Sequence, residues 1–131
     1  MERKISFPSK IESLRIVEKM IDELSAEFDI NSEAYGNILI ATLEAANNAI
    51  LHGNKLDESK EVNVEIKIEN SKLKIIVQDK GPGFDYENIP DPTAPENIEN
   101  INGRGVFLME KLSDEMEFRD EGSTVELGFN I

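Results

Sequence analysis

The sequence predicts an α+β fold, a two-layer sandwich in which one mostly antiparallel sheet carries helices on one face. Two helical stretches come first, strand-like alternation dominates the second half, and no regular alternation of strand and helix supports a Rossmann fold. The chain has 131 residues, close to the commonest domain size, so we expect residues 1–131 to form a single domain.

The first half of the chain predicts one short strand and two long helices. The strand is expected at residues 5–7, just before a proline. A helix then runs from Ser9, its candidate N-cap, to Phe28, with apolar residues recurring at helical spacing. The second helix begins at residues 31–32, either of which is a candidate cap, and ends at residues 53–54.

The second half predicts four strands, a loop and a short helix. The strands, all with apolar residues at every second position, are residues 62–68, 73–77, 115–120 and 124–130, with turns at 70–71 and 121–123. Residues 85–102 lack periodicity and contain three of the five prolines, which is typical of a functional loop. A short helix opens at Gly103 and runs to Leu112.

Composition excludes several classes of function. The formal net charge of −13 is spread along the chain and would repel a phosphate backbone, so nucleic-acid binding is not expected. The chain has no cysteine and one histidine, which excludes disulfides and makes a conventional zinc site improbable. No apolar run is long enough for a membrane helix and no secretory signal is visible, so we expect a cytoplasmic protein.

The second predicted helix carries a carboxylate and an amide on one face. Glu44 and Asn48 are four residues apart, in a segment otherwise rich in alanine, leucine and isoleucine. Polar groups on a largely buried helix need partners, and Mg²⁺ takes oxygen ligands of this kind. The alternative is that these groups face solvent, or that Asn47 and Asn48 help to end the helix.

A second candidate segment follows the strand at residues 73–77. Asp79, Gly81 and Gly83 form a turn whose glycines allow a ligand to approach the backbone. A carboxylate at a strand end can accept a hydrogen bond from an amino group such as the exocyclic amine of adenine. The alternative is an ordinary Asp/Gly/Pro turn, and the segment fits neither standard phosphate-binding fingerprint.

A third segment, Gly103-Arg104-Gly105, precedes the short helix. Small residues at a helix N-terminus present free N–H groups and the positive end of the helix dipole, which suits an anion. Arg104 would add positive charge beside it. The alternative is a glycine-rich loop that only caps the helix.

The order and spacing of these segments resemble the GHKL, or Bergerat-fold, ATPases, and most of all the stand-alone anti-sigma factor serine kinases of bacteria. The motif Glu-x-x-x-Asn-Ala-x-x-His-Gly is matched by Glu44, Asn48, Ala49, His52 and Gly53. The two glycine boxes and the closing Gly-x-Thr are matched by Asp79, Gly81, Gly83 and Phe84, by Gly103, Arg104, Gly105, Leu108 and Met109, and by Gly122 and Thr124. The resemblance spans essentially the whole chain.

The resemblance implies a role for each matched residue in binding ATP and Mg²⁺. Glu44 would be the general base and Asn48 a Mg²⁺ ligand, while Asp79, helped through water by Thr124, would read the adenine amine. The remaining roles are shared: Gly81 and Gly83 line the base pocket, Gly103, Arg104 and Gly105 close over the phosphates, and residues 85–102 form the ATP lid.

The resemblance also implies protein partners. Kinases of this group phosphorylate a serine of a STAS-type anti-anti-sigma protein, sequester a sigma factor and form homodimers. Arg15 falls roughly where the group has a partner-binding arginine, and His52 is expected to be a structural residue rather than a phosphoacceptor. The alternative function is an ATP-dependent protein-binding regulatory module without phosphotransfer.

Overall fold

The sheet has five strands in the order β1-β2-β3-β5-β4, and every neighbouring pair is antiparallel. This computed structural model describes residues 1–82 and 101–131, with the backbone alone at residues 101–104. The strands are β1 (Glu2–Pro8), β2 (Glu61–Glu69), β3 (Lys72–Gln78), β4 (Glu115–Arg119) and β5 (Thr124–Asn130). The predicted α+β fold class is confirmed.

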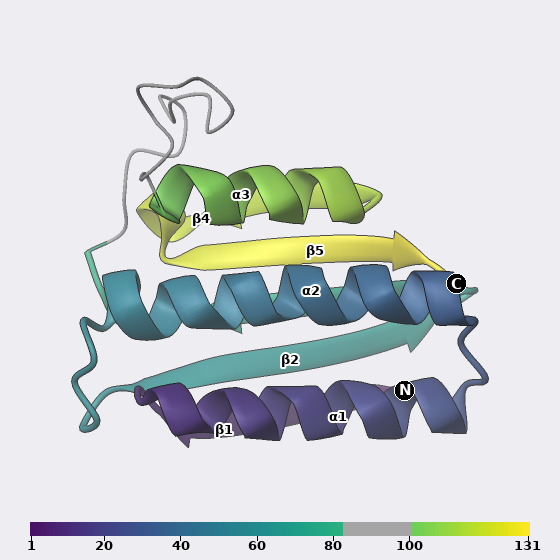
Figure 1. The fold of residues 1–131 in the computed structure, drawn as a ribbon, viewed down its shortest axis with the longest axis horizontal. Coiled ribbons are helices and arrows are strands. Elements are labelled where there is room, and N and C mark those ends of the chain that lie inside the picture. Colours follow the sequence, from purple (N-terminus) through teal and green to yellow (C-terminus); the bar gives the residue numbers. More distant parts are fainter. Residues whose placement is uncertain (83–100) are drawn as a thin grey trace.

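The helices lie on one face of this sheet (Figure 1). They are α1 (Leu14–Glu27), α2 (Ser32–Asn48) and α3 (Ile101–Leu112), with a 3₁₀ turn η1 (Ile11–Ser13) before α1. Asn31 caps α2, because its side chain accepts a hydrogen bond from the Ala34 N–H at 2.9 Å. At its far end α2 widens into a π-helical turn, η2 (Ala49–Gly53).

The core lies between the two layers and follows the predicted alternation. Val64 pairs with Val77 and Ile75 with Leu127 in the strand register, and each of these side chains is buried. Helix α1 meets them with four buried residues at helical spacing, Val17, Met20, Ile21 and Leu24. The alternate residues of the strands therefore face away from the helices.

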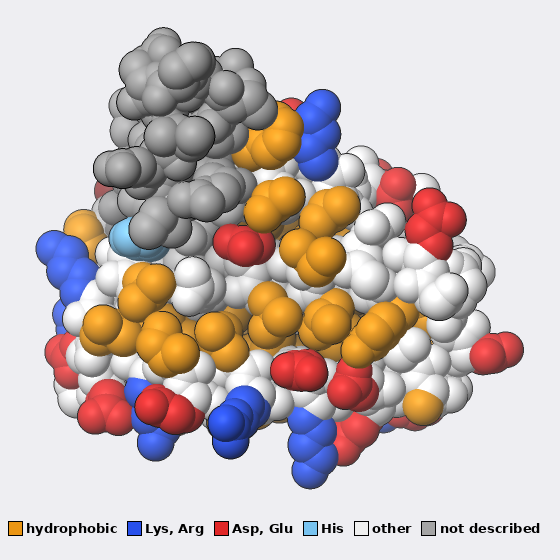
Figure 2. Space-filling view, in the orientation of Figure 1, with side chains coloured by type: hydrophobic (Ala, Val, Ile, Leu, Met, Phe, Trp, Pro, Cys, Tyr) orange, Lys and Arg blue, Asp and Glu red, His pale blue; other side chains and the backbone are white. Residues whose placement is uncertain are grey.

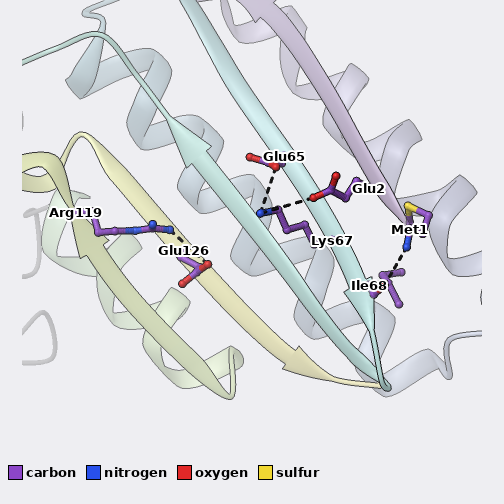
Figure 3. A network of polar contacts seen from close by, with 7 residues as sticks. All are labelled: Met1, Glu2, Glu65, Lys67, Ile68, Arg119 and Glu126. Atoms are coloured by element: carbon purple, nitrogen blue, oxygen red, sulfur yellow. Dashed lines mark hydrogen bonds and ion pairs between the residues drawn. The ribbon is translucent and has the colours of Figure 1, made fainter.

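That open face of the sheet is charged (Figure 3). Lys67 lies 3.5 Å from Glu65 and 3.8 Å from Glu2, while Arg119 lies 3.4 Å from Glu126. Such exposed pairs contribute little to stability individually. Because charged side chains are well solvated, this face of the sheet is stable in water without helices packed on it.

Two predicted helix boundaries were wrong. Ser9 does not cap α1; its hydroxyl donates to the Lys60 carbonyl at 2.6 Å, and the helix begins at Leu14 after Ser13. A long-range hydrogen bond has here replaced the local cap. Helix α3 begins at Ile101 rather than Gly103, so residues 101–102 belong to a helix and not to the predicted loop.

In the part of the chain that the structure covers, no helix combines the length and apolar character needed to cross a membrane.

Buried hydroxyl groups in this core give a stability test. Thr42 is 0% exposed, and its hydroxyl has no hydrogen-bond partner among the described residues. Thr42→Val should leave the free energy of unfolding unchanged or raise it by about 1 kcal/mol, since a desolvated unpaired hydroxyl is removed. Ser13→Ala is the matched control: its buried hydroxyl donates to the Pro8 carbonyl at 2.8 Å, so its loss should cost roughly 1 kcal/mol. Urea unfolding of both variants measures this, and a large loss in Thr42→Val would contradict it.

Candidate functional site

A pocket of about 270 Å³ lies between the end of α2 and the strands beneath it. Its walls come from α2, η2, α3 and the three strands β3, β4 and β5. Its apolar lining includes Ala45, Ala49, Val77, Val106, Met109 and Val125, and its polar lining includes Asn48, His52, Asp79 and Ser123. An apolar pocket with a few polar groups is typical of a site for a small, partly polar ligand.

Glu44 lies next to Asn48 where α2 meets α3, but it is not one of the residues that line the described pocket. A methyl group at Gly105 would lie 2.9 Å from Asn48 Nδ2 and 3.1 Å from Glu44 Oε2, so both side chains reach the α3 backbone. The structure thus brings together Glu44, Asn48 and Gly105. Gly105 lies inside α3 rather than at its opening, and its lack of a side chain permits this close approach.

The Asn48 side chain offers an oxygen for which the described residues supply no partner. Its Oδ1 is buried and accepts no hydrogen bond from any residue that the structure describes. A buried carbonyl oxygen in this condition is costly unless something else pairs with it. No group of three or more His, Asp or Glu side chains among the described residues could hold a metal. An amide oxygen is among the oxygen ligands that Mg²⁺ takes, so this residue fits such an ion as one ligand.

Asp79 also lines the pocket and follows β3 directly. Its N–H donates to the Ser123 carbonyl at 2.9 Å, and its Oδ1 accepts from the Gly81 N–H at 2.7 Å. Burial raises the pKa of the Asp79 carboxyl, although the Gly81 hydrogen bond lowers it. One carboxylate oxygen is therefore engaged by the turn, while the group as a whole faces the pocket.

Two glycines set the distance between η2 and the turn after β3. A methyl group at Gly53 would overlap the Asp79 carboxylate, and one at Gly81 would overlap the Gly53 carbonyl oxygen. Both positions therefore require glycine for close approach rather than for backbone freedom. The π-helical turn carries Gly53 into this contact, as such turns often do at functional sites.

His52 lines the pocket from η2, but it brings little charge. Partial burial lowers the pKa of its imidazole, so the ring is neutral at pH 7. Positive potential for an anionic ligand must therefore come from elsewhere.

Two residues of the closing motif, Gly122 and Ser123, line the pocket, as does the following Val125. The Thr124 hydroxyl donates to Asp120 Oδ2 at 2.9 Å. Thr124 pairs with Gln78 in the strand register, next to Asp79. It is thus near the predicted adenine reader, without lining the described pocket.

Several predicted site residues cannot be placed. Gly83 and the lid residues 85–100 lie outside the described residues, and so does the side chain of Arg104. Gly103 is in the first turn of α3, and its role at an anion site stays a prediction.

Sequence reasoning missed Asn54, which it interpreted only as the end of a helix. This side chain is 1% exposed and donates to Ser9 Oγ and to the Glu61 carbonyl, while accepting from the Lys80 N–H. An asparagine directly after a glycine signals a helix end, and no sequence pattern reveals such distant partners.

Comparisons with known proteins agree with this geometry. A family profile for the histidine kinase-like ATPase domain matches residues 7–129. The serine-protein kinase RsbW of Bacillus licheniformis is 31% identical over 127 residues, covering 92% of this chain and 79% of the relative. RsbW of Listeria monocytogenes is 30% identical over 128 residues, covering 92% and 82%.

Among solved structures, a Mycobacterium tuberculosis protein crystallised as its RsbU and RsbW domains has the same fold. It superimposes with a TM-score of 0.72 at 19% identity, covering 99% of this chain and 32% of that one.

The glycine contacts give a matched pair of stability predictions. Gly81→Ala should lower the free energy of unfolding by roughly 1–3 kcal/mol, because the new methyl group overlaps backbone that cannot rotate away. Gly36→Ala is the control: nothing lies within 4 Å of its added methyl group, so this α2 residue should gain about 0.5–1 kcal/mol of stability. Denaturant unfolding of both variants tests the contact, and equal effects would argue against it.

Proposed function

Since this chain belongs to the histidine kinase-like ATPase domain family, we propose that it is a Mg²⁺- and ATP-dependent serine-protein kinase that phosphorylates a STAS-type anti-anti-sigma partner. The resemblance found in the sequence is confirmed by that family match and by relatives named serine-protein kinase RsbW. Those relatives support serine kinase activity, and the bacterial anti-sigma kinases that the sequence resembles suggest the partner.

The arrangement of Asn48 and Glu44 carries the proposal. Among the described residues, the buried amide oxygen of Asn48 has no partner, the Glu44 carboxylate lies beside that side chain, and both Asn48 and Asp79 line an apolar pocket. A nucleotide has the matching polarity, with phosphates and metal at one end and an amine-bearing base at the other. Asn48 would hold Mg²⁺, which offsets phosphate charge, and Asp79 would accept a hydrogen bond from the adenine amine.

In this proposal Glu44 is the general base. It lies next to Asn48 against α3 and is only partly buried, so an acceptor hydroxyl can reach it from outside. In the reaction, the serine oxygen forms a bond to the γ-phosphorus as the bond from that phosphorus to the bridging oxygen breaks. ADP leaves, and the serine proton passes to Glu44 and then to solvent. Positioning and charge neutralisation contribute most to such transfers.

We further propose that the partner docks on the helical face near α1. Arg15 is exposed there, as are the apolar side chains of Ile11 and Ile16, which are 46% and 44% accessible. Figure 2 shows apolar side chains gathered over α1 and α2 on this face. Sigma-factor binding and homodimerisation, which the sequence resemblance implies, belong to the same proposal.

Replacing the proposed base tests the enzyme. Glu44→Gln should bind Mg²⁺·ATP within about twofold of the parent chain, yet lose phosphate transfer by at least about a hundredfold, because the amide cannot take a proton. Calorimetric titration with ATP, with and without Mg²⁺, measures binding, and radiolabelled phosphate on the serine of a STAS protein measures transfer. Undiminished transfer in Glu44→Gln would overturn its role. Binding without any transfer in the parent chain would favour the regulatory module that does not transfer phosphate.

Asp79→Asn should weaken ATP binding without lowering the stability of the folded chain. Because burial raises the pKa of Asp79 in the folded chain, the folded state loses stability as the pH rises through that raised value. An asparagine never ionises, so the nucleotide-free variant should match or exceed the parent melting temperature at pH 7, and this difference should narrow as the pH falls. ATP affinity should instead drop by about tenfold or more, since the charged acceptor is lost. Thermal unfolding and calorimetry check both, and unchanged affinity would show that the adenine end is misplaced.

A further inference from the structure

The Asn54 side chain bonds to three other segments of the chain, at Ser9, Glu61 and Lys80. Its side-chain amide donates to Ser9 Oγ at 2.8 Å and to the Glu61 carbonyl at 3.2 Å, and its Oδ1 accepts from the Lys80 N–H at 2.7 Å. Both amide hydrogens and the oxygen are therefore used. A buried side chain with all its hydrogen bonds formed has one orientation, because any rotation would leave polar groups unpaired.

The bond to Lys80 bears directly on the pocket. Lys80 lies between Asp79, whose carboxyl faces the pocket, and Gly81, whose N–H donates to that carboxyl. Within the described residues, the backbone of this turn is fixed on one side by the Asp79 N–H bond to Ser123 and on the other by Asn54. The main chain of Asn54 is itself anchored, as its N–H donates to the Ala49 carbonyl at 2.8 Å in the π-helical turn.

We propose that Asn54 is a positioning residue for base recognition. Its buried side chain holds the Asp79–Gly81 turn in the position in which the Asp79 carboxylate accepts a hydrogen bond from the base. This inference rests on the proposed nucleotide site. Asp79 can accept a hydrogen bond from the amino group of adenine, whereas guanine presents a carbonyl oxygen at that position. An Asp79–Gly81 turn that Asn54 holds in place therefore favours adenine over guanine. Without the bond from Asn54, the turn should lose this preference.

The test compares two variants of the same network. Asn54→Ala frees the Lys80 N–H, whereas Ser9→Ala removes a hydroxyl that contacts Asn54 and Lys60 but leaves the Lys80 bond intact. Both should lower the melting temperature. Only Asn54→Ala should weaken ATP binding by about tenfold and reduce the ratio of ATP to GTP affinity by a similar factor, since one well-aligned hydrogen bond is lost.

The two proposals can fail separately. If the parent chain does not bind ATP, the proposed function fails; if it binds ATP and Asn54→Ala keeps the parent preference over GTP, only the positioning role is overturned. An equal loss of preference in Ser9→Ala would also overturn it, since general loosening would then explain both. Hydrogen exchange of the Lys80 amide in the nucleotide-free parent chain needs no variant: protection supports the role, and rapid exchange overturns it.

Discussion

The contact between η2 and the turn after β3 is the constraint on which the candidate site depends. No side chain separates Gly53 from Gly81, so the end of α2 lies directly on the strand layer. Because of this contact, the Asp79 carboxylate packs against Gly53, and both residues line the pocket. Gly105 likewise allows α3 to approach Asn48 and Glu44 closely. Three glycines therefore permit the tight contacts around the site.

Charge is the second constraint. The chain has a net charge of −13, and the described pocket is lined by one acidic side chain, Asp79, and by the neutral imidazole of His52, with the Glu44 carboxylate next to Asn48. A nucleotide would add further negative charge, so a cation at Asn48 and the N–H groups of the first turn of α3 are the features that could offset it. The binding of such an anion to an acidic protein therefore depends on a divalent ion more strongly than it would in a basic one.

The sequence predicted the fold well because its periodicities reflect the faces that are buried. The alternation around Val64 and Ile75 and the helical spacing from Val17 to Leu24 each place apolar residues on one side. Local patterns also located Glu44, Asn48 and Asp79 on the right elements. They failed where a distant partner determines what a side chain does. Ser9 donates a hydrogen bond to Lys60 instead of capping a helix, and the Asn54 side chain bonds to three other segments. Close backbone packing at Gly105 is likewise a property of two helices together.

The strand order has a consequence for folding. Strands β2 and β3 are joined by a two-residue turn, Asn70 and Ser71, with φ of 52° and 61°, and such a hairpin forms quickly. The pocket needs a slower event, because Asp79 follows β3 while Ser123 precedes β5, and these strands pair only after a long loop closes. Secondary structure thus appears before the pocket exists, and recovery of ligand binding during refolding reports the closure of the sheet.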